Sequence, residues 1–256
     1  FSVKDSTPIL INERVLSVEA EILPGVKENQ FSWMVGGEAG YGIMVTGALF
    51  SKACTRGGLY IFDYAEYPSL IRGGHNSFQV HVSDTPVHAQ VHWVDLLIAL
   101  DQQTIHEQFS KITRGGGLIY ENGKVKLEPP LNKPDLNLYP MPLIDLAKQA
   151  GGDDLMKNTV ALGATLALVN YDLSILEKLI EEAFANKGEA VNINKQAANL
   201  GFKYIKEHFN KSFGWKLSVK SSEKRMVVSG NEALVAGALR AGCKFLAAYP
   251  MTPMNA

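Results

Sequence analysis

Cysteine is scarce in this chain of 256 residues, which contains only Cys54 and Cys243. The two residues lie too far apart in the sequence to suggest a chelating pair. The sequence therefore predicts neither a disulfide framework nor a zinc or iron–sulfur site, and we assign no metal to this chain. Any metal that the protein uses is expected to come from a partner.

The chain also lacks an excess of basic residues and long apolar runs. Its formal net charge is −1 and its pI is near 6.7, which argues against a polyanionic partner such as nucleic acid. No uninterrupted apolar stretch approaches the length of a membrane span, and residues 1–25 carry charges throughout rather than a basic start and an apolar block. We expect no membrane association and a cytoplasmic location.

Hydrophobic residues make up 46% of the sequence, enough for a substantial core, and their periodicity alternates between strand and helix patterns. We predict an α/β fold: a three-layer α/β/α domain with a mixed or mostly parallel sheet, followed by the truncated start of a second α/β domain. The predicted strands cover residues 14–23, 31–37, 59–68, 76–84, 94–101, 117–123 and 245–250. The predicted helices cover residues 42–58, 102–112, 140–151, 158–172, 173–188, 189–209 and 229–241. Gly115 to Gly117 are expected to end the helix at 102–112.

Changes in composition suggest how the chain is divided. Residues 1–30 are interpreted as an N-terminal strand or arm, and residues 31–212 as the main domain. A polar connector at 213–226 marks the predicted boundary, and residues 227–256 begin a new unit. Because the apolar strand predicted at 245–250 needs neighbours, we expect the natural polypeptide to continue.

The most informative stretch is "MVGGEAGYGIMVTG", where Gly36, Gly37, Gly40 and Gly42 lie between a strand and a helix. A strand, a glycine turn and a helix start direct backbone N–H groups at an anion. The spacing is neither the dinucleotide fingerprint G-x-G-x-x-G nor a Walker loop. Glycine also serves tight turns and close packing, so the pattern fits both a phosphate-binding loop and a packed turn.

A second stretch, "IRGGHNSF", contains Arg72 and His75 on either side of two glycines. An arginine on flexible backbone can bind a phosphate or carboxylate, although an interface arginine with a solvated histidine is the plainer interpretation. His81, His88 and His92 have no spacing typical of a metal site.

Asp95 and Asp101 flank the apolar strand "LLIAL". Aspartate at such positions accepts hydrogen bonds from free backbone N–H groups, so we predict that both serve in a turn or a helix cap.

Several separate motifs carry a family resemblance. "GGEAGYGI", "PSLIRGGHNSFQVHVSDTPV", "NTVALGA" and "NKQAANLGF" resemble the gamma domain of 2-oxoacid:ferredoxin oxidoreductases, in the expected order. "GNEALVAGALRAGCKFLAAYPMTP" resembles the opening of the pyrimidine-binding domain of the alpha subunit, as in two-subunit members of the 2-oxoglutarate type. The resemblance covers nearly all of the chain from Phe31 to Pro253.

The resemblance implies oxidative decarboxylation of a 2-oxoacid to acyl-CoA and carbon dioxide, with electrons passing through iron–sulfur centres to ferredoxin. The resemblance also implies that a separate beta subunit supplies most of the site for thiamine diphosphate and Mg²⁺, together with a [4Fe–4S] cluster. The resemblance implies that Thr252, in "YPMTP", hydrogen bonds the substrate carboxylate. Met251 stands where the family usually has Ile. The acidic residue and the arginine that the family uses for thiamine activation and substrate binding lie beyond the matched segment.

For the gamma domain, the resemblance implies a position near the coenzyme A path. The glycine loop would then contact a phosphate, and Arg72 and His75 would line coenzyme A or a subunit interface. The fused arrangement favours 2-oxoglutarate over pyruvate and branched-chain substrates. The alternative is a non-redox module that binds a nucleotide or coenzyme A, or that assembles subunits.

Overall fold

The computed structural model describes residues 25–68, 73–128, 133, 135–185, 188–221, 225–247 and 249. The strands, in chain order, are β1 (Lys27–Glu28), β2 (Gln30–Glu38), β3 (Tyr60–Glu66), β4 (His75–Ser83), β5 (Val94–Ala99), β6 (Ile112–Glu121), β7 (Asn137–Met141) and β8 (Trp215–Lys216). The α-helices are α1 (Ile43–Arg56), α2 (Gln102–Gln108), α3 (Leu143–Gln149), α4 (Lys157–Leu168), α5 (Leu173–Phe184), α6 (Ala190–His208) and α7 (Gly230–Arg240). The chain also forms two short 3₁₀ helices, η1 (Phe109–Lys111) and η2 (Asp154–Met156).

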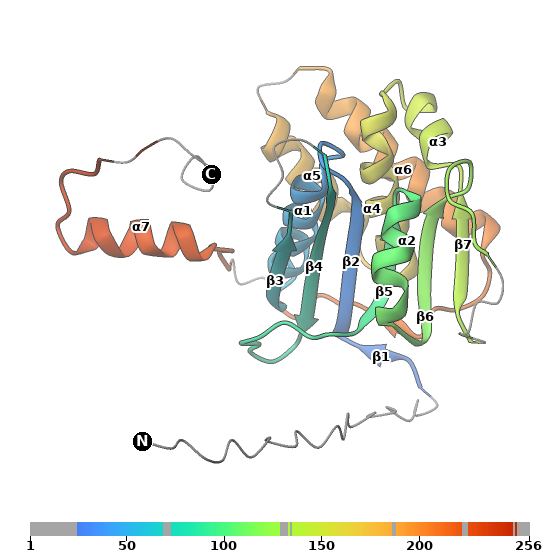
Figure 1. The fold of residues 1–256 in the computed structure, drawn as a ribbon, viewed down its shortest axis with the longest axis horizontal. Coiled ribbons are helices and arrows are strands. Elements are labelled where there is room, and N and C mark those ends of the chain that lie inside the picture. The colour runs from blue at the N-terminus through green and yellow to red at the C-terminus, as the bar shows by residue number, and fades with distance from the viewer. Residues whose placement is uncertain are drawn as a thin grey trace, which may run out of the picture.

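Six strands form one mixed sheet in the order β3-β4-β2-β5-β6-β7. β2, β5, β6 and β7 are parallel, whereas β4 runs antiparallel to both β2 and β3. Helix α2 lies in front of the sheet in the view of Figure 1, and α1, α4, α5 and α6 lie behind it. The predicted three-layer α/β/α domain with a mixed sheet is confirmed.

Two apolar cores occupy the two faces of the sheet, as the alternation of strand side chains requires. On the face covered by α1, α4, α5 and α6, Trp33, Val35 and Ile98 belong to the large core. On the other face, Met34 and Leu97 belong to a small core against α2. Successive residues of a strand thus point to opposite faces of the sheet. Their side chains pack against the helices on each face.

The structure corrects the predicted end of the helix at 102–112. α2 ends at Gln108, and Gly115 to Gly117, which we predicted as the helix stop, lie inside β6. A Cβ on Gly117 would come within 2.7 Å of Leu96 Cδ1 and 3.0 Å of Phe213 Cε2. Glycine serves close packing at this point of the sheet rather than helix termination.

The predicted connector at 213–226 is wrong in its first part. Phe213, Trp215 and Leu217 are at most 5% exposed and belong to the large core. β8 also pairs in parallel with β1, which ties this segment to the residues just before β2. The alternation of apolar residues in "FGWKL" is that of a strand. The folded part of the chain therefore continues beyond residue 212, and we call its described residues up to 221 the body.

The segment after residue 225 differs from the body. α7 forms as predicted, with Ser229 and Glu232 in a capping box, but all of its residues are exposed. It lies apart from the sheet in Figure 1. The described residues of 245–250 form no strand and pair with none of the described strands, and Phe245 is 84% exposed. A second domain beginning at 227 stays a prediction, and the strand predicted at 14–23 lies outside the described residues.

Candidate functional site

The carboxyl edge of the sheet contains the predicted glycine loop. From β2 the chain passes through α1 to β3 on one side of the sheet, whereas from β5 it passes through α2 to β6 on the other side. β2 and β5 are adjacent and parallel, so the loops that follow them diverge at this edge. Such a switch point in strand order is where open α/β sheets bind ligands.

The turn at residues 39–42 connects β2 to α1 and has the features of an anion site. Gly40 and Gly42 have φ values of 97° and 71°, in the left-handed region that favours glycine. Gly42 is the N-cap of α1 and contributes no side-chain hydrogen bond, and the first turn of the helix contains no acidic residue. The first N–H groups of α1, which have no intrahelical partners, are therefore open to an anion.

The four predicted glycines have separate roles. Gly36 and Gly37 lie within β2 and pair with β4, so they do not belong to the turn. A Cβ on Gly36 would come within 2.6 Å of Thr104 Cγ2 and 2.9 Å of His75 Cε1. A Cβ on Gly40 would meet nothing within 4 Å, whereas a Cβ on each of the other three glycines would meet a neighbouring side chain. The phosphate hypothesis rests on Gly40 and Gly42.

The first residues of α4 contact this turn. Asn158 Nδ2 donates a 2.9 Å hydrogen bond to the carbonyl oxygen of Tyr41. The same nitrogen would lie 2.6 Å from a Cβ on Gly42, so a larger residue at this position would displace the amide. Lys157 places Nζ 3.5 Å from the centre of the Tyr41 ring, although its residue is only 1% exposed.

Ionisable groups around the turn have perturbed pKa values. Burial, followed by the neighbouring Glu38 carboxylate, raises the pKa of Tyr41, so the phenol stays neutral. Burial lowers the pKa of Lys157, and nearby Lys124 adds to this effect, whereas Asp101 and other carboxylates oppose it.

His75 lies at the start of β4, where it is 9% exposed. Its Nε2 lies 3.4 Å from Gln108 Nε2 and 3.9 Å from Glu107 Oε2, both of α2. Its Nδ1 has no hydrogen-bond partner among the described residues. His75 therefore packs between the sheet and α2 and not in the open turn. Arg72 and Thr252 lie outside the described residues, so their roles stay predictions.

Sequence reasoning did not single out Lys157. The available signal was a lysine immediately before "NTVALGATLAL", because eleven of the twelve residues of α4 are buried and a charge is out of place on such a helix. Within the described ranges, no three His, Cys, Asp or Glu side chains gather into a metal-binding group.

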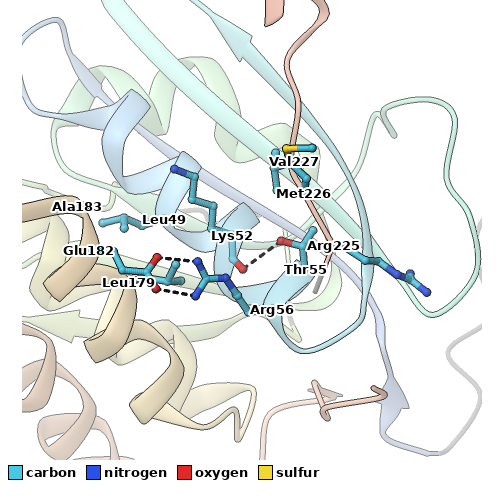
Figure 2. A pocket seen from close by; sticks show the side chains of 10 residues that line it. All are labelled: Leu49, Lys52, Thr55, Arg56, Leu179, Glu182, Ala183, Arg225, Met226 and Val227. Atoms are coloured by element: carbon cyan, nitrogen blue, oxygen red, sulfur yellow. Dashed lines mark hydrogen bonds and ion pairs between the residues drawn. The ribbon is translucent and has the colours of Figure 1, made fainter. Parts of the chain in front are cut away.

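A concave region away from the glycine turn lies between α1, α5 and the segment at 225–227 (Figure 2). It encloses about 520 Å³, and Arg56 forms a two-bond ion pair with Glu182 in its wall. It contains none of the predicted site residues. The three residues 225–227 that form one wall belong to the segment leading to the exposed α7, so the groove is a junction between the body and that segment.

Comparison with known proteins identifies the fold. A family model described as pyruvate ferredoxin/flavodoxin oxidoreductase matches residues 32–204, which include the turn and the start of α4. The chain belongs to this family. Among the described residues, no helix has both the length and the apolar character needed to cross a membrane.

Relatives of this family match beyond the body. The alpha subunit of the 2-oxoacid:ferredoxin oxidoreductase of Saccharolobus solfataricus is 24% identical over 88% of this chain, which spans 41% of that subunit. A 2-oxoglutarate:ferredoxin oxidoreductase from Magnetococcus marinus, with 2-oxoglutarate, coenzyme A and succinyl-CoA bound, superposes with a TM-score of 0.79. It is 28% identical and is matched over 89% of this chain and 40% of its own.

A separate gamma subunit is similar to part of this chain. The gamma subunit of a keto/oxoacid ferredoxin oxidoreductase from Geobacter sulfurreducens is 26% identical, with a TM-score of 0.56. The match covers 68% of this chain and 97% of that subunit. The match to the longer alpha-type chains is therefore consistent with a gamma-type body joined to further sequence.

Proposed function

We propose that this chain is the gamma-type domain and the beginning of the alpha-type domain of a 2-oxoacid:ferredoxin oxidoreductase. The enzyme would convert a 2-oxoacid, coenzyme A and oxidised ferredoxin to acyl-CoA, carbon dioxide and reduced ferredoxin. The observation that carries this proposal is the match over 89% of the chain to the Magnetococcus structure that binds coenzyme A and 2-oxoglutarate. The ligands in that structure also favour 2-oxoglutarate as the substrate.

The redox cofactors do not fit the donors of this chain. Cys54 is fully buried, and burial raises the pKa of its thiol, which disfavours the thiolate that iron requires. Cys243 is the one other cysteine, so the sequence cannot supply the thiolates of a [4Fe–4S] cluster. We assign the cluster and most of the thiamine diphosphate site, with its Mg²⁺, to a beta subunit, and place the assembled enzyme in the cytoplasm.

Coenzyme A fits the carboxyl edge of the sheet better. Its phosphates would accept hydrogen bonds from the N–H groups at the start of α1, beside the open Gly40. Binding there would anchor the carrier, and its long flexible arm would leave the thiol free to reach the reacting centre elsewhere in the assembly. Thr252 would hydrogen bond the substrate carboxylate, as the family motif implies.

Steady-state kinetics of the complex assembled with its beta subunit test this proposal. A panel of 2-oxoglutarate, pyruvate and 2-oxoisovalerate is compared by ferredoxin reduction, and we expect 2-oxoglutarate to give the highest kcat/KM. Replacing Gly40 by Val should raise the KM for coenzyme A about tenfold or more while leaving the KM for the 2-oxoacid unchanged. Gly188→Val is the matched control, because Gly188 also has a positive φ of 54° and open space around its Cβ.

A complex that reduces ferredoxin equally well without this chain would contradict the proposal. It would support the alternative of a non-redox module for binding or assembly. An unchanged KM for coenzyme A in Arg72→Ala would argue against the predicted role of that arginine.

A further inference from the structure

Lys157 is a largely buried cation that has no anionic partner among the described residues. Its residue is 1% exposed, and no hydrogen bond or ion pair of its ammonium group occurs among the described residues. The ammonium contacts the face of the Tyr41 ring, and no described residue offers its N–H donors a hydrogen-bond acceptor. Most of the Lys157 side chain is buried, and a charge with so little access to water is stabilised by an anionic partner.

The carboxylates that influence Lys157 are engaged elsewhere. Glu121 accepts hydrogen bonds from the backbone N–H groups of Gly123 and Ile144. Asp101 caps α2 by accepting from the N–H and the hydroxyl of Thr104. Asp154 forms an ion pair with Lys148 at 3.4 Å. These carboxylates favour the charged form of Lys157 at a distance, but none of the described carboxylates forms an ion pair with its ammonium group.

Lys157 also adjoins the uncapped start of α1. Tyr41, beneath its Nζ, is the residue between Gly40 and Gly42, and the neighbouring Asn158 holds the Tyr41 carbonyl. The partial positive charge of a 14-residue helix and a full positive charge therefore meet at one turn. Lysine acts as a point charge for phosphate, and helix N-termini bind the same group.

We infer that Lys157 and the first N–H groups of α1 form one binding site for a phosphate or pyrophosphate group of the ligand. Its identification with coenzyme A rests on the proposed function, but the anion site itself follows from the buried lysine and the turn. Lys157 is then a binding residue that neutralises the phosphoryl charge, and Asn158 is a positioning residue that fixes the turn.

Inorganic pyrophosphate is a direct probe of this site. Thermal unfolding of the full 256-residue chain is followed with pyrophosphate and with sodium chloride at equal ionic strength. We expect pyrophosphate alone to raise Tm by roughly 5 °C at about 100 times its Kd. Lys157→Met should weaken pyrophosphate binding about tenfold to a hundredfold. The control Lys203→Met removes an exposed lysine paired with Glu207 on α6 and should leave binding unchanged.

The unliganded Tm separates a ligand site from a structural cation. Removal of an unpaired buried charge should leave the Tm of Lys157→Met equal to that of the wild type or higher. A large drop in this Tm with unchanged pyrophosphate affinity would overturn the inference. Hydrogen exchange of the wild type gives a second readout, in which pyrophosphate should protect the amides of residues 40–45. No protection there would also overturn it.

The two proposals can fail separately. Pyrophosphate binding that depends on Lys157, without coenzyme A turnover in the assembled complex, would remove the proposed function and keep the anion site. Turnover with an unchanged KM for coenzyme A in Lys157→Met would remove the anion site and keep the proposed function.

Discussion

Gly40 and Gly42 show how neighbouring residues of one type meet different constraints. Both adopt left-handed backbone, but only Gly42 is also closed in by a side chain, the amide of Asn158 at 2.6 Å from a Cβ. Gly40 faces open space. Conformation alone therefore restricts Gly40, whereas conformation and packing together restrict Gly42.

This difference predicts unequal costs for alanine. Gly40→Ala should lower the free energy of unfolding by about 1–2 kcal/mol, the cost of a left-handed alanine. Gly42→Ala should cost about 1–3 kcal/mol more, because it also displaces the Asn158 hydrogen bond to Tyr41. Urea unfolding of both variants, with Gly214→Ala as an open control of ordinary φ, measures the difference. Equal losses at positions 40 and 42 would contradict this view of the turn.

Asp95 is a second residue whose role depends on its surroundings. It lies within β5, 4% exposed, and accepts hydrogen bonds of 2.9 Å from Ser32 N and Thr113 Oγ1. The prediction of a turn or cap is wrong for Asp95 but confirmed for Asp101, which caps α2. Burial raises the pKa of Asp95 from 3.8 to about 6, although its two hydrogen bonds oppose this rise.

The raised pKa predicts a pH dependence with a definite sign. The folded protein holds the Asp95 proton more tightly than the unfolded chain, so this stabilisation is complete below pH 3.8 and is lost as pH rises through about 6. The unfolding free energy of the wild type minus that of Asp95→Asn should therefore fall by about 3 kcal/mol between pH 3.8 and pH 7. Denaturant titrations across this range measure it, and a difference that stays constant or rises with pH would refute it.

At the scale of elements, a reciprocal pair of glycines sets the contact between α4 and α6. A Cβ on Gly163 would lie 1.9 Å from the carbonyl oxygen of Ala198, and a Cβ on Gly201 would lie 1.9 Å from that of Val160. Each helix thus accepts the backbone of the other at a position without a side chain. The two glycines belong to "NTVALGA" and "NKQAANLGF", so these two family motifs encode a helix crossing.

Alanine at either glycine should force the helices apart. Gly163→Ala is expected to lower the free energy of unfolding by about 2–3 kcal/mol or more, because backbone cannot move aside as a flexible side chain can. Gly237→Ala, at an open position within exposed α7, is the matched helical control and should change it by less than about 0.5 kcal/mol. Chemical unfolding followed by circular dichroism tests the pair, and a tolerated Gly163→Ala would contradict the close crossing.

Periodicity predicted the larger elements of the body, because one face of each strand and helix is apolar. The prediction failed where the same residue type is common in two different structural settings. Gly115 suggested a helix stop because glycine commonly ends helices, but it lies in β6, which begins at Ile112. Trp215 appeared in a polar stretch, yet its strand completes the large core. The turn at Gly40 and Gly42 was predictable, whereas the approach of Lys157 from more than a hundred residues away depends on the tertiary fold.

At the scale of the whole molecule, the body and the segment after 225 differ in burial. The core residues lie in the body, whereas every residue of α7 is exposed, as are Phe245 and Tyr249. The Geobacter gamma subunit is matched over 97% of its length by 68% of this chain. The stability of the body should then be largely independent of the segment that follows it.

Truncation tests this independence. A chain ending at residue 228 keeps the contact of Arg225 with the Tyr60 ring and should unfold within about 2 °C of the 256-residue chain. Calorimetric scans of the two chains provide the comparison. A loss of more than about 5 °C would show that the residues from 229 onward stabilise the body.

The central claim is that the turn after β2 binds a phosphate of coenzyme A. Isothermal titration of coenzyme A into the 256-residue chain, its Gly40→Val variant and the strain-matched Gly188→Val variant tests it most directly. The account predicts binding by the wild type and Gly188→Val, and an affinity at least about tenfold weaker in Gly40→Val. Equal affinity in all three chains, or no binding by the wild type, would contradict the claim.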